Sequence, residues 1–382
     1  MGEGKQRNLP CPCGSKKKYK NCCMDKKRVP QDVINYFNNV IAEKKIKEDM
    51  GIYINYVKPI LWQGKKVWAI GNRVYHNRPP DETFHQFIID ILRITLGKDW
   101  WEENLNLSFE EKHFILKCYF KFYDWLTRGS VKREKVTGAV FAAKPDGWSK
   151  SLLSLAFDVC SLMQIGNLPE CLVERLKNKN EYQGARYEIT IAAIFARLGC
   201  KIEFLDEKDK PTIKHCEFIA THQETGTSIA VEVKSRHRAG VIHTFGIKNE
   251  EDLLKGDVQR LLKKALEQNP GDRPFMIFID LNSPITPEKE VKDKQWFEDI
   301  KNIIAGRGAR TAENPDLYNA IIVTNYSYHY QTEKEADKGE FLQFVPLYPK
   351  FPLPNDKFME MLRSALNYYG NVPNLDIDGE LN

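Results

Sequence analysis

The sequence predicts an α/β protein, because helical and strand patterns alternate through its second half. Residues 181–199 place apolar side chains at helical spacing and end at a glycine, where helices commonly stop. Residues 216–222 and 228–235 read as two strands around a turn, and residues 275–279 are wholly apolar, as in a buried strand. A strand over residues 201–207 and a helix over residues 253–268 complete this order.

The expected hairpin brings together side chains suited to metal-dependent hydrolysis. Because side chains alternate along a strand, Glu232 and Lys234 share one face, and closing the turn brings Glu217 to within about one residue of Glu232 across the ladder. Two carboxylates and a backbone carbonyl are suitable ligands for a hard divalent cation, and Glu217, Glu232 and the carbonyl of Val233 can supply them. Lys234 is then a candidate to orient or deprotonate a water, with its pKa lowered by cations and apolar neighbours.

The tripeptide alone also has an ordinary interpretation. Glu-x-Lys is common on protein surfaces, where an ion pair contributes less than about 1 kcal/mol. The helix before the hairpin favours a site instead. Glu188 lies at helical spacing from Ala192 and Phe195 and is expected to face the core, where an unpaired carboxylate is costly. It therefore needs a partner, and a metal site is one such partner.

Together, the acid of this helix, the hairpin and Glu232-Val233-Lys234 resemble the PD-(D/E)xK nuclease superfamily over roughly residues 180–330. The resemblance implies the restriction-endonuclease-like fold, a mixed sheet flanked by helices, and Mg²⁺ or Mn²⁺ as the catalytic cofactor. It implies a nucleic-acid substrate, DNA in preference to RNA. The catalytic residues that it implies are Glu188, Glu217, Glu232 and Lys234, with Gln259 on the following helix as a further polar residue. A glutamine at that position is equally typical of a solvated helix face.

One motif departs from the family. His215-Cys216-Glu217 stands where proline-aspartate is usual, so a longer carboxylate with one more rotatable bond must reach the cation. This departure favours a retuned or weakened site. The basic run 234–238 that follows places cations beside the proposed phosphate position, or is simply a solvated strand end.

The N-terminal residues predict a zinc knuckle. Cys11, Cys13, Cys22 and Cys23 are four thiols in a segment too short to build a core of its own, and they can surround one tetrahedral Zn²⁺ as a structural ion. Two disulfides are the alternative, which the adjacency of the last two cysteines disfavours. With Gly14-Ser15 and the lysines around Tyr19, the segment resembles the SEC-C motif. Its basic character suits nucleic acid, the ribosome or an acidic protein surface as a partner.

Composition sets limits on the class of protein. The 382 residues are enough for two or three domains, and 42% hydrophobic residues argue against disorder. No apolar run approaches the length of a membrane span, so we expect no membrane partner. The nine cysteines, mostly scattered singly, and the polar N-terminus predict a cytoplasmic protein. The net charge of only +5 means that nucleic-acid affinity must come from local patches.

We expect four segments along the chain: a zinc knuckle (1–30), a mainly helical accessory domain (31–178), a nuclease-like domain (179–335) and a C-terminal extension (336–382). In the accessory domain, short strands are expected around Gln63-Gly64. Its expected helices cover residues 33–49, 81–96, 108–126, 149–164 and 170–177, the third with the capping-box pair Ser108 and Glu111. A strand over residues 318–324 is expected near the end of the nuclease-like domain, and a helix over residues 356–369 is expected in the C-terminal extension.

Two function classes follow from the sequence. The first is a divalent-metal nuclease that a zinc knuckle targets. The second is a catalytically inactive protein of nuclease fold that binds nucleic acid, the ribosome or the secretion machinery. Glu188, Glu232 and Lys234 favour the first class, and glutamate at position 217 favours the second.

Overall fold

The computed structural model describes residues 8–11, 16–21, 31–129, 131–137, 140–205, 215–308 and 310–374. The chain divides into two compact units, Met1–Ile46 and Lys47–Asn382. The first unit contains a short 3₁₀ helix over Tyr19–Asn21 and most of the helix α1 (Gln31–Asp49). The second unit contains the large sheet and all remaining helices of the described residues.

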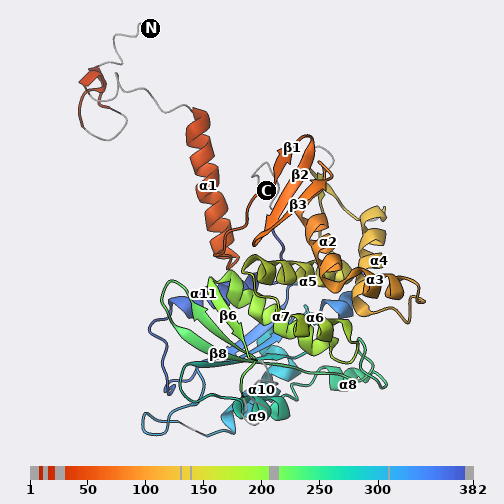
Figure 1. The fold of residues 1–382 in the computed structure, drawn as a ribbon. Coiled ribbons are helices and arrows are strands. Elements are labelled where there is room, and N and C mark those ends of the chain that lie inside the picture. The colour runs from red at the N-terminus through yellow and green to blue at the C-terminus, as the bar shows by residue number, and fades with distance from the viewer. Residues whose placement is uncertain are drawn as a thin grey trace. The chain divides into compact units, whose positions relative to one another are not determined.

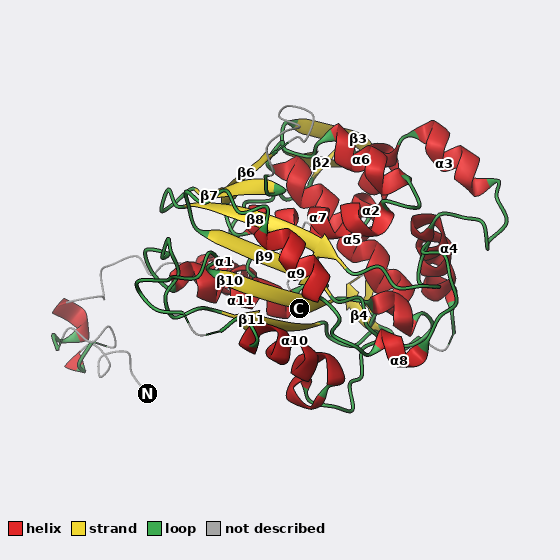
Figure 2. Cartoon of the chain, turned by 90° about the horizontal axis from the view of Figure 1, so that it is seen from below, coloured by secondary structure: helices red, strands yellow, loops and turns green. Residues whose placement is uncertain are grey.

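A six-stranded mixed sheet organises the second unit (Figure 2). Its strands stand in the order β11-β10-β9-β8-β7-β6. β8, β9 and β10 are parallel neighbours, and every other neighbouring pair is antiparallel. The strands are β6 (Cys200–Phe204), β7 (Phe218–His222), β8 (Ser228–Ser235), β9 (Phe275–Asp280), β10 (Ala320–Asn325) and β11 (Glu340–Phe344). The expectation of an α/β protein with a mixed sheet is confirmed.

Helices cover both faces of this sheet because its central strands are apolar on both sides. Val231 and Val233 of β8 belong to the larger core, which also contains residues of α5, α7 and α11; Ala230 belongs to a second core with α9 and α10. Figure 1 shows α5, α7 and α11 on one side of the sheet and α9 and α10 on the other. The helices are α5 (Gly147–Gln164), α6 (Glu170–Lys177), α7 (Tyr182–Arg197), α8 (Glu250–Leu253), α9 (Gln259–Leu266), α10 (Gln295–Ala305) and α11 (Lys357–Tyr368).

The segment that precedes α5 adds three helices and two small sheets. Its helices are α2 (Phe84–Leu96), α3 (Lys98–Leu105) and α4 (Phe114–Thr127); its strands are β1 (Ile60–Trp62), β2 (Lys65–Ile70), β3 (Arg73–Arg78), β4 (Glu134–Thr137) and β5 (Val140–Ala142). The expected turn at Gln63-Gly64 is confirmed, and both residues have a positive φ. The buried Trp68 of β2 stacks on Phe87 of α2 at a centroid distance of 4.6 Å, which joins the small sheet to the helices.

Two helices begin later than the sequence pattern predicts. The helix expected from residue 81 begins at Phe84, because Thr83 and Gln86 form the capping box there. The helix expected from residue 108 begins at Phe114, where the His113 side chain accepts a hydrogen bond from the backbone N–H of Ile115. The predicted pair of Ser108 and Glu111 does form, but it closes an isolated turn.

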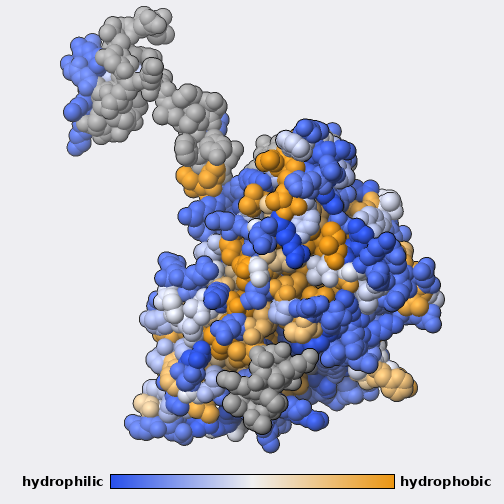
Figure 3. Space-filling view, viewed as in Figure 1, coloured by the Kyte–Doolittle hydropathy of each residue, from blue (hydrophilic) through white to orange (hydrophobic). Residues whose placement is uncertain are grey.

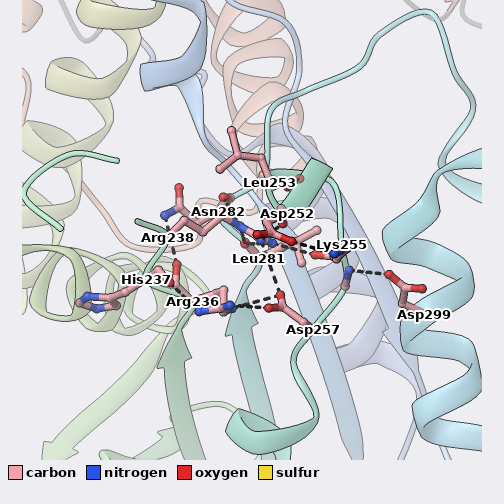
Figure 4. A network of polar contacts seen from close by, with 12 residues as sticks. Arg236, His237, Arg238, Asp252, Leu253, Lys255, Asp257, Leu281, Asn282 and Asp299 are labelled. Atoms are coloured by element: carbon pink, nitrogen blue, oxygen red, sulfur yellow. Dashed lines mark hydrogen bonds and ion pairs between the residues drawn. The ribbon is translucent and has the colours of Figure 1, made fainter. Parts of the chain in front are cut away.

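The single helix expected over residues 253–268 is wrong, since the chain leaves the helical path between α8 and α9. Two contacts explain the break. The buried Arg238 guanidinium donates hydrogen bonds to the carbonyls of Asp252 and Lys255, which therefore serve as loop acceptors (Figure 4). Gly256 lies so close to α10 that a Cβ there would stand 2.5 Å from the Trp296 carbonyl oxygen.

The surface is mainly polar, and the three-stranded sheet β1–β3 is one of the places where apolar side chains gather (Figure 3). The exposed apolar residues of this region are Val57, Ile60, Leu61, Trp62 and Val74. Among the helices that the structure describes, we find none that combines the length and apolar character needed to cross a bilayer.

Candidate functional site

The strand ladder places Glu217 opposite Glu232. β7 and β8 pair with Phe218 opposite Val231, so the residue before β7 faces the residue after Val231. Lys234, two residues along β8, points to the same side as Glu232. Its Nζ lies 3.1 Å from Oε1 of Glu217 and forms a second ion pair with Glu232. The three side chains therefore form one cluster at the ends of two neighbouring strands.

Burial differs sharply within this cluster. The Glu232 side chain is 1% exposed, whereas Glu217 and Lys234 are 28% and 22% exposed. Oε2 of Glu232 is buried and accepts no hydrogen bond among the described residues. Solvent and ligands can thus reach the cluster from the side of Glu217 and Lys234, while Glu232 forms its closed end.

This environment controls protonation. Burial raises the pKa of Glu232 to about 8, against the lowering effect of Lys234, and the neighbouring Glu217 and Glu188 raise it further. Burial alone would lower the pKa of Lys234, but the two ion pairs outweigh burial and raise it. Without a bound cation, the pKa of Lys234 is therefore raised and not lowered, because two carboxylates surround the ammonium. At neutral pH the lysine is a proton donor.

Glu188 of α7 is buried, as expected, and its direct partner is Arg175 of α6. The guanidinium donates two hydrogen bonds to the carboxylate, of 2.6 and 2.7 Å. Burial and the charge of Glu217 nevertheless raise the pKa of Glu188 to about 7, against the lowering effect of Arg175. Glu188 thus lies close enough to the hairpin cluster to interact with it electrostatically. Sequence reasoning missed Arg175, and the buried carboxylate's need for a counter-charge was the only available signal.

Other expected site residues lie apart from the cluster. Gln259 is exposed at the first residue of α9 and, among the described residues, makes no hydrogen bond to these acids. The Val233 side chain packs in the opposite core, so only its backbone carbonyl remains a candidate ligand.

The basic run after β8 is used mainly inside the protein. Arg236 pairs with Asp257, and Arg238 is buried among backbone carbonyls (Figure 4). Of these expected cations, Lys234 is the one that lies in the cluster with Glu217 and Glu232.

The structure describes only some of the side chains that the sequence predicts as metal ligands. Across residues 31–129, 131–137, 140–205, 215–308 and 310–374 and the two short N-terminal stretches, no group of three or more His, Cys, Asp or Glu side chains is arranged to hold a metal ion. Cys11 is buried, while Cys13, Cys22 and Cys23 of the expected zinc knuckle lie outside the described residues.

Comparison with known families identifies one match, the SEC-C motif, over residues 7–25. This match includes all four cysteines of the knuckle and implies zinc binding by the N-terminal segment. Comparisons of the chain with curated proteins and with solved structures give no match.

Proposed function

We propose that the chain is a divalent-metal-dependent nuclease whose site is the cluster of Glu217, Glu232 and Lys234. The observation that carries the proposal is that one ammonium contacts two carboxylates, one from the residue before β7 and one from the adjoining strand β8. One of these carboxylates is closed from solvent and the other is open to it, which is a suitable asymmetry for holding a ligand at one end of the cluster.

The arrangement of elements supports the proposal. A helix, a three-stranded antiparallel meander, a helix and a strand parallel to the last meander strand follow one another as α7, β6–β7–β8, α9 and β9. The resemblance of the sequence to the restriction-endonuclease-like fold implies this order of elements, so the order supports the proposal. The resemblance brings Glu217, Glu232 and Lys234 to the positions of that family's site, with glutamate where aspartate is usual.

The side chains present fit a hard cation. Oε2 of Glu232 is a buried carboxylate oxygen without a hydrogen-bond donor, which is costly unless a ligand satisfies it. Glu217, Glu232 and the Val233 carbonyl would hold Mg²⁺ or Mn²⁺, both of which prefer oxygen ligands. When bound, such an ion neutralises phosphate charge and acidifies a water.

The protein's own groups have distinct roles in this proposal. Lys234, which keeps its proton at neutral pH without a bound ion, would donate a hydrogen bond to a phosphate oxygen or to a water. Glu232 must lose the proton that burial favours before it can bind a cation. Glu188, which is paired with Arg175, lies close enough to the cluster to contribute to its electrostatic potential.

The test is cleavage of DNA and RNA by the purified full-length protein with added Mg²⁺ or Mn²⁺. Glu232→Gln and Lys234→Ala should each abolish cleavage, because the first removes the charge that holds the cation and the second removes the donor to phosphate. Glu224→Gln, at the exposed turn of the same hairpin, is the matched control and should cleave like the parent. Equal cleavage by all three variants would assign the activity to another site.

A second candidate function is a non-catalytic binding protein of the same fold. Lys234 already forms ion pairs with both acids, which supplies positive charge to the cluster without a metal ion. This alternative predicts tight binding of nucleic acid by the parent protein with no cleavage under any metal condition. SEC-C-mediated binding to the ribosome or to another protein belongs to the same alternative.

A further inference from the structure

A cavity of about 190 Å³ lies where the chain leaves β8, beyond the proposed cleavage cluster. Its wall includes Gln183 of α7 and the loop residues His237, His243, Thr244 and Phe245. The volume is several times the roughly 30 Å³ that one water occupies in the liquid, so a ring-sized group can enter. None of the residues that line it is acidic.

Gln183, which lines this cavity, carries a hydrogen-bond acceptor without a partner among the described residues. Only 3% of the residue is exposed, and its Nε2 donates to Oγ of Ser235 at 3.2 Å and to the carbonyl of Arg236 at 2.9 Å. A carbonyl can only accept, and Ser235 gives its own proton to Asp280, so the amide orientation is determined by its partners. Oε1 is therefore the buried atom left without a partner, and a donor from a water or a ligand would satisfy it.

His243 supplies the complementary donor. Its Nε2 accepts a hydrogen bond of 3.0 Å from the backbone N–H of Phe114 at the start of α4. Burial and the nearby Lys179 and Lys117 lower the pKa of His243 to about 4, so the ring is neutral at pH 7 and carries its proton on Nδ1. The residues that line the cavity thus include one acceptor and one donor, both uncharged.

The loop that carries this wall is held in place. Arg238 donates hydrogen bonds to the carbonyls of Leu281 and Asn282, and the neighbouring Arg236 pairs with Asp257; His237 projects away from this network (Figure 4). Gly240 has φ of 70°, and its N–H donates to the Thr244 carbonyl at 3.1 Å, which closes the turn. The wall is therefore formed before any ligand binds.

Two features at the mouth suit a nucleotide. Phe245 is fully exposed and offers an aromatic face, on which bases stack. Lys179 is exposed at the rim and supplies positive charge for a phosphate. The Gln183 amide, in turn, bonds the two residues that directly follow Lys234.

We propose that this cavity binds one unstacked nucleobase of a single-stranded nucleic acid, next to the phosphate that reaches Lys234. A planar, uncharged ring with an N–H donor and an acceptor on one edge matches Gln183 and His243. The inference rests on the proposed nuclease function for its substrate class and adds the preference for an unpaired base. DNA and RNA present the same chemistry to the cavity.

The test measures binding without added Mg²⁺ or Mn²⁺, using the full-length Glu232→Gln protein and fluorescein-labelled single-stranded DNA. An abasic residue is placed at each position of the oligonucleotide in turn. One position should weaken binding about fivefold or more, since stacking of one base contributes about that much or more. An RNA oligonucleotide of the same sequence shows which sugar is preferred.

Thr244→Trp fills the cavity and should remove the sensitivity to the abasic position. Ile247→Trp is the matched control, because it adds the same ring at a residue that is 91% exposed on the same loop and should keep that sensitivity. Phe245→Ala, at a fully exposed position that contributes little to folding, should weaken binding and provides a second variant if Thr244→Trp fails to fold.

The base-binding proposal would be overturned if no abasic position weakened binding. It would also be overturned if the same abasic position weakened binding equally in the parent and in Thr244→Trp. The outcome for cleavage is separate. If the parent protein binds in a base-dependent way but never cleaves, the base-binding proposal stands and the nuclease proposal fails. If it cleaves but no abasic position weakens binding, the nuclease proposal stands and the base-binding proposal fails.

Discussion

Replacing Glu232 with glutamine should stabilise the protein, and the gain should grow as the pH rises. The folded protein keeps a proton on Glu232 up to a pKa of about 8, while the unfolded chain releases it near the ordinary value of 4.5. Between these values the folded state binds more protons than the unfolded state, so this group lowers the free energy of unfolding as the pH increases. Glutamine does not titrate and removes that loss.

The magnitude follows from the size of the pH window. From pH 5 to pH 8 the group can cost at most about 4 kcal/mol, at about 1.36 kcal/mol for each pH unit. Glu188, Glu217 and Lys234 interact with the same carboxylate, and they readjust when it is neutral. We therefore expect about half of this limit. The free energy of unfolding of Glu232→Gln, relative to that of the parent, should increase by about 2 kcal/mol from pH 5 to pH 8.

The assay is urea unfolding followed by tryptophan fluorescence at several pH values, without added magnesium or manganese. Glu224→Gln is the control, since this turn residue has a side chain that is 68% exposed. A constant difference between Glu232→Gln and the parent across pH 5 to 8 would refute the reasoning. It would show that Glu232 is ionised in the folded protein at neutral pH.

Three further predictions use the same purified protein. It should contain about one equivalent of zinc by elemental analysis, and Cys22→Ser should lower that content; a zinc-free parent would contradict the knuckle. Arg175→Ala leaves the buried carboxylate of Glu188 unpaired and should lower the free energy of unfolding by about 1–3 kcal/mol at pH 8. The loss should be smaller at pH 6, where that carboxyl protonates. Lys177→Ala on the same helix is the control and should lower the free energy of unfolding by less than about 0.5 kcal/mol. Gly256→Ala should cost about 1–3 kcal/mol, because its Cβ meets a carbonyl of α10, while Gly129→Ala meets nothing within 4 Å and should be nearly neutral; equal urea midpoints for the two variants would contradict this packing.

The sequence predicted the hairpin well because its pattern is local. Strand alternation and the length of the turn are sufficient to place Glu217 opposite Glu232 and to put Lys234 on the same side. The wholly apolar pattern of residues 275–279 predicted β9 for the same reason, since a strand buried on both faces has few polar positions.

Helix starts were predicted less well, because several residues can act as a cap and packing decides among them. Ser108 and Glu111 form the contacts of a capping box, yet α4 begins at Phe114. There His113 caps the helix and packs edge-on against Tyr182, a residue 69 positions later in the chain. Nothing in the local pattern indicates that contact.

By itself, the sequence determined the zinc motif, the α/β class and the face on which the acids of the hairpin lie, because each depends on the spacing of nearby residues. Tertiary structure alone decided which charges meet. Arg175 binds Glu188, Arg236 pairs with Asp257, and the buried Arg238 donates hydrogen bonds to loop carbonyls. The physical reason is that burial removes water from a charged group and makes its partner whichever opposite charge the packing of distant elements brings within hydrogen-bonding distance.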